Sequence, residues 1–257
     1  MSGFGILLQK ELSEAWRTRR LPMVAVLFVV IGIISPLTAR YLNEILAVAL
    51  GDQLPVALPE PTVATALEQL QKNLGQIGAL AAIALAMGSV SGELDRGTAA
   101  LVLAQPVGRP AFLGAKLLAI AVVLGVATLL ASAVAWVYTA ILFEPVPAGG
   151  WLAMTTLSWL ALVAWAALTF LASAATGSTT AAAGLGFVAL VGLGLLAIVP
   201  AVDRFLPTGL AAPAISLAAD SGASVGDGRL ATAVAGSVVL IAISLAGALT
   251  AFRRREL

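Results

Sequence analysis

Three ionic residues, Glu93, Asp95 and Arg96, stand together directly after a long apolar run. They open the stretch 91–118, whose second half carries a further cation, Arg109. Carboxylate and guanidinium groups at a membrane surface form oriented ion pairs with a partner protein, and an exposed pair contributes about 0–1 kcal/mol. These residues therefore suit the orientation of a protein contact, and we assign no catalytic residue to them.

The segment between these ionic groups predicts a short helix. Thr98, which follows Gly97, is suited to cap its first turn. Apolar residues such as Leu101 and Leu103 follow, and the helix must end before Pro106, because the residue before a proline avoids the α conformation. This apolar helix is not one of the predicted membrane spans, so we expect a protein surface to cover it. A solvated loop with no partner is the alternative that spacing alone leaves open.

Glu11 is an ionic residue in an unusual setting. Residues 4–20 have the periodicity of a basic amphipathic helix, which suits the membrane interface, although a basic anchor that only fixes topology is the alternative. Glu11 falls inside the apolar face, between Leu7 and Ala15. A carboxylate there needs a partner or must reach water. It either contacts a neighbouring cytoplasmic element or lies exposed beside Lys10, and both interpretations stay open.

Missing residue types exclude many kinds of chemistry. The chain has no Cys and no His, which removes thiolate, zinc–thiolate, iron–sulfur, Ser-His and HExxH sites. It also has no GxxxxGK[ST] loop, because none of its lysines, Lys10, Lys72 and Lys116, follows Gly or precedes Ser or Thr. We therefore expect a protein that is not an enzyme, with no cofactor or metal of its own. Any ATP and Mg²⁺ would be bound by a partner subunit.

The elements that position these residues are membrane spans. Hydrophobic residues make up 60% of the 257, charged residues 11%, and the mean hydropathy is +1.04. An average soluble domain is about 45–50% apolar and about 25% charged. A lipid bilayer needs about 20 helical residues, and six apolar runs without Asp, Glu, Lys or Arg have near this length: 21–39, 74–90, 117–143, 151–175, 180–199 and 230–252. We predict an all-α membrane protein of six transmembrane helices.

The distribution of basic residues predicts the orientation of the spans. The face that receives the two termini and the loop after span two has ten Lys and Arg residues, and the other face has four. By the positive-inside rule, we expect both termini to lie in the cytoplasm and the spans to cross the inner (plasma) membrane. The net charge of +1 does not suit a nucleic-acid partner. We expect one domain over 1–257, made of an amphipathic helix at 1–20, a six-span bundle at 21–252 and a basic tail at 253–257.

The sequence of the spans does not identify the transported substrate. They lack ionisable residues, which argues against ion-coupled transport and against an intramembrane site for a small charged substrate. The substrate-binding residues stay unknown. On the outer side, Val63, Leu67, Leu70 and Leu74 recur with helical spacing, and this pattern predicts an amphipathic helix near the outer surface before span two. A helix that seals the edge of the bilayer is favoured over a gate or a dimer contact.

The order of these features resembles the permease subunits of type-2 ABC transporters. The similarity covers almost the whole chain, with one departure: the turn 176–180 has no basic residue where relatives often carry one. Three motifs carry it: KEL at 10–12 at the start of the chain, GIISPLTARYL at 32–42 at the end of span one, and LASAATGSTTAAAGLGF at 171–187 at the turn after span four. The strongest part is the loop after span two, with Glu93, Gly97, Thr98, Pro106, Val107, Arg109 and Lys116.

The resemblance implies a function and a set of partners. It implies a permease, working as an exporter and a homodimer in the lipid bilayer, driven by two copies of an ABC ATPase subunit that contact a cytoplasmic coupling helix within 92–110. A non-transporting anchor, sensor or regulatory subunit of an ATPase complex is the alternative. The residues expected at the ATPase contact are Glu11, Glu93, Asp95, Arg96, Gly97, Thr98, Leu101, Leu103, Pro106 and Arg109.

Overall fold

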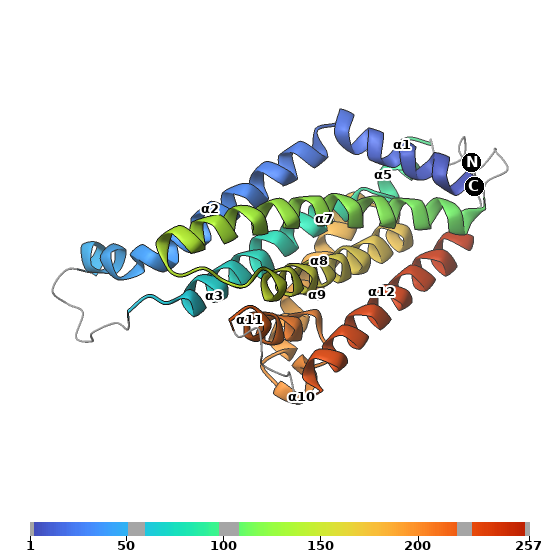
Figure 1. Cartoon of the computed structure of the whole chain (residues 1–257). Coiled ribbons are helices and arrows are strands. Elements are labelled where there is room, and N and C mark those ends of the chain that lie inside the picture. Colours follow the sequence, from blue (N-terminus) through green and yellow to red (C-terminus); the bar gives the residue numbers. More distant parts are fainter. Residues whose placement is uncertain (1–2, 51–59, 98–107, 220–227, 255–257) are drawn as a thin grey trace.

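The computed structural model describes residues 3–50, 60–97, 108–219 and 228–254, and in these parts the chain is helical without a strand (Figure 1). Six helical stretches within them are long and apolar enough to cross a membrane. The predicted all-α membrane fold is therefore confirmed. Each of the six predicted spans falls on one of these stretches, although the ends differ.

The chain begins with two helices joined by a sharp turn. Helix α1 (Gly3–Arg17) is followed by a turn in which Arg19 has a positive φ of 60°, and α2 (Arg20–Leu50) then begins. Helix α1 lies against α7 (Arg109–Leu142), and α2 packs along α7 as well. The approach of α2 to α7 is close at Gly32, where a Cβ atom would lie 2.3 Å from the backbone oxygen of Ala131. Only Gly fits at this crossing.

The second span differs from its prediction. Helix α3 (Val63–Asn73) continues through the π-helical segment η2 (Leu74–Gly78) into α4 (Ala79–Met87), without leaving the helical conformation at either junction. The expected amphipathic helix before span two is thus present, but it continues directly into span two. Two of its polar side chains face neighbouring helices inside the bundle: the amide oxygen of Gln71 lies 3.0 Å from Oγ of Ser158, and Asn73 donates a hydrogen bond to Ser35.

Helix α8 (Ala148–Thr176) is the most buried of the spans. It contacts α4, α7, α9 (Thr179–Leu196) and α12 (Arg229–Arg253), so it forms the centre of the bundle. Between α9 and α12 the described residues form three short elements that the sequence pattern did not indicate. They are α10 (Pro200–Asp203), η3 (Pro207–Leu210) and α11 (Ala211–Ala219), and α11 packs on α8.

Both chain termini lie at the same end of the bundle (Figure 1). We call this the terminal end. Here the start of α7 meets the end of α12: the guanidinium group of Arg109 donates a hydrogen bond of 3.0 Å to the carbonyl of Arg253, and the rings of Phe112 and Phe252 stack 5.7 Å apart. The short helix α5 (Ser91–Asp95), which follows span two, also lies at this end.

Candidate functional site

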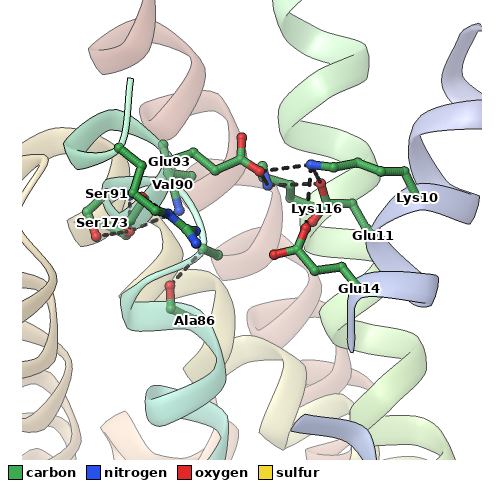
Figure 2. A network of polar contacts seen from close by, with 12 residues as sticks. Lys10, Glu11, Glu14, Ala86, Val90, Ser91, Glu93, Lys116 and Ser173 are labelled. Atoms are coloured by element: carbon green, nitrogen blue, oxygen red, sulfur yellow. Dashed lines mark hydrogen bonds and ion pairs between the residues drawn. The ribbon is translucent and has the colours of Figure 1, made fainter. Parts of the chain in front are cut away.

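The ionic side chains at the terminal end converge from three helices into one cluster (Figure 2). The ammonium group of Lys116 on α7 lies 2.7 Å from Oε1 of Glu93 on α5 and 2.9 Å from Oε1 of Glu11 on α1. Lys10 on α1 contacts the same two oxygens, at 2.9 Å from Glu93 and 3.0 Å from Glu11. A third carboxylate, that of Glu14, lies 3.6 Å from Lys10. We call these five residues the ion cluster.

Burial in the ion cluster is strongest at its centre. The side chains of Lys116 and Glu93 are 3% and 6% exposed, whereas that of Lys10 is 41% exposed. The ammonium group of Lys116 also lies 5.0 Å from the centre of the Phe112 ring. Charges removed from water require partners, and removing one partner of such a pair is strongly destabilising. The pair of Glu93 and Lys116 therefore fixes α5 to α7.

Lys10 covers the cluster on its solvent side. Partial burial alone would lower the pKa of Lys10, but the hydrogen bond to Glu93 and the nearby carboxylate of Glu11 outweigh it, and the pKa is raised above its ordinary value. A raised pKa favours the charged form, so Lys10 stays protonated at all physiological pH values. The contact between Lys10 and Glu93, which joins α1 to α5, is thus ionic at physiological pH.

The amphipathic sequence of α1 explains why its carboxylate faces the bundle. Leu7 is buried, and Phe4 and Leu8 pack against the same core. Glu11 lies one turn after Leu7 and shares its face. Of the two interpretations of Glu11, the structure shows the contact with another element, because Lys116 on α7 donates to it. Lys10 is a second partner of the same carboxylate.

A second set of contacts holds α5 on its other side. Oγ of Ser173, near the end of α8, accepts hydrogen bonds from the backbone N–H groups of Val90 (3.3 Å) and Ser91 (3.0 Å). The hydroxyl groups of Ser91 and Thr179, the first residue of α9, lie 2.9 Å apart. We call Ser91, Ser173 and Thr179 the hydroxyl cluster. The turn between α8 and α9, which lacks a basic residue, thus reaches α5 through neutral hydrogen bonds.

The other residues expected at the ATPase contact lie outside both clusters. Asp95 and Arg96 are exposed, and the guanidinium group of Arg96 donates to the carbonyl of Gly92 within its own turn (2.8 Å). Gly97 has a φ of 67° and ends α5, as Gly residues commonly do at helix ends. Arg109 contacts α12, away from the ion cluster. The remaining expected residues lie outside the described residues: Thr98, Leu101, Leu103 and Pro106.

Sequence reasoning named Glu11 and Glu93 as contact residues but missed the other six members of the two clusters, which are Lys10, Glu14, Lys116, Ser91, Ser173 and Thr179. The signal for the two lysines was Glu11, since a carboxylate on an apolar face requires a cation nearby. Nothing local in the sequence indicated Ser173, because its partners lie 82 and 83 residues away.

The carboxylates of the ion cluster come close enough together to suggest a metal ion, but the lysines give a different explanation. Oxygen atoms of Glu11, Glu14 and Glu93 lie within 4.8 Å of one another. Lys10 contacts all three residues and Lys116 contacts two of them. Three negative charges thus face two positive ones at contact distance. The arrangement suits an internal ion network that joins helices.

Comparison with known proteins agrees with this architecture. The family model described as ABC-2 family transporter protein matches residues 6–257. The transmembrane protein YxlG of Bacillus subtilis (strain 168), which is itself described as uncharacterized, is 30% identical over 141 residues. These residues are 54% of this chain and 54% of the relative, so the match spans about half of the relative's length.

Proposed function

Since this chain belongs to the ABC-2 family of transporter proteins, as its sequence resemblance predicted, we propose that it is the permease subunit of an ATP-driven exporter. The family membership and the six apolar helices make the chain a multi-pass membrane protein. In the proposal, two copies form the path through the membrane and two separate ATPase subunits supply the energy. Both termini, and with them the terminal end, lie in the cytoplasm.

The position of α5 is the observation that carries this proposal. The ion cluster joins α5 to α1 and α7, and the hydroxyl cluster joins it to α8 and the start of α9. Span two leads directly into it. A five-residue helix with no core of its own is thus tied to five other helices. A force applied next to α5 would therefore reach most of the bundle.

The proposed point of action is the segment 98–107, which directly follows α5. Its apolar sequence suits a helix that docks in a groove of the ATPase, while Arg96 and Asp95 orient the contact from outside. Movement of the ATPase on nucleotide binding would displace this segment and, through α5, the spans. Rigid helices transmit such a displacement as a change between two packed arrangements.

Two substitutions test the docking. Leu101→Asp would place an unpaired carboxylate in the apolar contact, which costs several kcal/mol. Arg96→Ala removes one exposed charge and should cost about 1 kcal/mol or less. We expect Leu101→Asp to reduce the amount of ATPase that co-purifies in mild detergent more than tenfold. Arg96→Ala should reduce it by a factor of about five or less.

The comparison requires equal amounts of each variant in the membrane. The purified permease alone should hydrolyse no ATP, because it has no phosphate-binding loop. If Leu101→Asp assembles with the ATPase as well as the parent does, segment 98–107 is not the docking element. ATP hydrolysis that stays with the isolated chain would refute the need for a separate ATPase.

A further inference from the structure

A large cavity lies on the side of the bundle away from the ion cluster. It has a volume of about 480 Å³, which is within the range of small-molecule sites, about 300–1,000 Å³. Its walls come from α3, η2 and α4 on one side, α8 and α9 on another, and η3 with α11 at the end. Most of the lining is apolar, including Leu74, Leu80, Leu157, Leu162, Trp165 and Phe187.

One buried polar group in this wall has unused hydrogen-bonding capacity. Gln71 is 8% exposed, and its amide nitrogen has no partner among the described residues. Its amide oxygen lies 3.0 Å from Oγ of Ser158, but that hydroxyl group also lies 2.8 Å from the carbonyl of Met154. One hydroxyl proton cannot serve both oxygens. A buried polar group left in this state is costly unless a bound molecule completes its hydrogen bonds.

The rim of the cavity carries a cation that is available to a ligand. Lys72 is exposed and, within the described part of the chain, forms no ion pair or hydrogen bond. None of the described residues that line the cavity is acidic. Asp203 accepts a hydrogen bond from Thr208 on the rim (2.7 Å) but does not itself line the cavity. The rim therefore favours an anionic group.

The wall beside this rim has two further features that suit a ligand-binding cavity. The π-helical segment η2 carries Gly75, and a Cβ atom there would meet nothing within 4 Å. Single-turn π segments are frequent at functional sites. Leu80 and Phe187 line the cavity and are 45% and 52% exposed, on two helices that are apolar enough to span a membrane. A hydrocarbon chain can therefore enter from the surrounding lipid.

We propose that this cavity binds a single-chain anionic amphiphile, with its hydrocarbon chain against Leu162 and Trp165, its carbonyl group at Gln71 and its charge at Lys72. The apolar side chains of α8, the amide group of Gln71 and the ammonium group of Lys72, which has no partner among the described residues, line one and the same cavity. The inference goes beyond the proposed function and does not depend on it, because binding is measured on the permease alone.

Quenching of tryptophan fluorescence by dibromostearic acid tests the proposal, because bromine quenches indole on contact. The full-length chain is placed in nanodiscs of phosphatidylcholine. We expect a saturable component of quenching that is lost in Trp165→Phe. Ala161→Phe should weaken binding more than tenfold, because residue 161 lies at the centre of the α8 face that lines the cavity. The control Ala242→Phe, an exposed alanine on α12, should leave binding unchanged.

The headgroup is tested with a charge-free probe. Lys72→Gln should weaken binding of dibromostearic acid about tenfold but not that of dibromostearyl alcohol. Quenching without a saturable component in the parent, or equal affinity in Ala161→Phe, would overturn the site. If Lys72→Gln weakens the binding of both probes equally, or weakens the binding of neither, the proposed site for an anionic headgroup is wrong. If Ala161→Phe does not fold, the smaller Ala161→Leu gives the same comparison.

Discussion

Glu93 at the end of span two and Lys116 at the start of span three lie 2.7 Å apart and are almost completely buried. The two residues are 23 positions apart, and the segment between them contains the expected ATPase contact. The ion pair therefore closes a loop whose tip lies in the proposed docking element. In the proposed mechanism, this pair makes spans two and three move together when the loop is displaced.

The first prediction concerns the stability that this pair provides. Glu93→Gln should destabilise the protein, since removing one partner of a buried ion pair costs about 3–5 kcal/mol. Glu11, which stays 2.9 Å from Lys116, should hold the loss near the lower end of that range. Glu14→Gln is the matched control, because Glu14 contacts Lys10 at 3.6 Å near the surface and should cost about 1 kcal/mol or less. Thermal unfolding followed by size-exclusion chromatography measures both, and equal midpoints for the two variants would contradict the prediction.

The second prediction separates stability from energy coupling. Glu93→Met combined with Lys116→Met should be more stable than either single variant, because apolar replacement of both charges removes their desolvation cost. Lys10 and Glu11 would remain paired at 3.0 Å. The double variant should nevertheless lose most of its effect on the ATP hydrolysis of the assembled complex, since α5 is no longer tied to α7. Full coupling in the stable double variant would mean that the ion pair serves stability alone.

The third prediction concerns the hydroxyl cluster. Ser173→Ala should leave the backbone N–H groups of Val90 and Ser91 without their acceptor, at a cost of about 1–3 kcal/mol each at most. Hydrogen–deuterium exchange at these two amides should accelerate at least tenfold. Thr156→Ala, an exposed residue of the same helix that bonds its own turn, should have no such effect. Unchanged exchange in Ser173→Ala would show that α8 does not hold α5.

The spans were predictable because lipid imposes a length and a composition. Span four was expected at 151–175 and forms Ala148–Thr176. The start of span two was missed for a physical reason: Glu68 and Lys72 are charged and exclude residues 63–73 from an uncharged apolar run. Gln71 and Asn73 are polar as well, yet both contact side chains of neighbouring helices inside the bundle. Hydropathy cannot distinguish a polar residue that faces water from one that contacts a serine side chain inside the helix bundle.

The site was predictable only in part, because its contacts are distant in sequence. Glu11 indicated that a partner must exist, since a carboxylate on an apolar helix face is costly alone. The identity of that partner, Lys116, is a property of how α1 crosses α7, 105 positions later. No local sequence pattern predicts where α1 crosses α7. The apolar segment 98–107 stays a prediction, because it lies outside the described residues.

The fourth prediction concerns orientation. Because the chain has no Cys, single cysteines can be introduced and labelled from outside intact cells with a membrane-impermeant maleimide. Glu60→Cys, before α3, should be labelled, whereas Asp95→Cys, at the terminal end, should be labelled only after the cells are opened. Both variants are exposed on the surface, which makes them matched. The reverse pattern would place the termini outside and remove the proposed ATPase contact from the cytoplasm.

The central claim is that a separate ATPase acts on the permease at the segment that follows α5. A photo-crosslinking amino acid at position 101 tests this most directly, with the same amino acid at position 60 as the control at the opposite end. The account predicts that position 101 captures a protein with a GxxxxGK[ST] loop, that position 60 does not, and that Glu93→Met combined with Lys116→Met leaves the capture intact. Capture of such a protein from position 60, or none from position 101 in a complex that hydrolyses ATP, would contradict it.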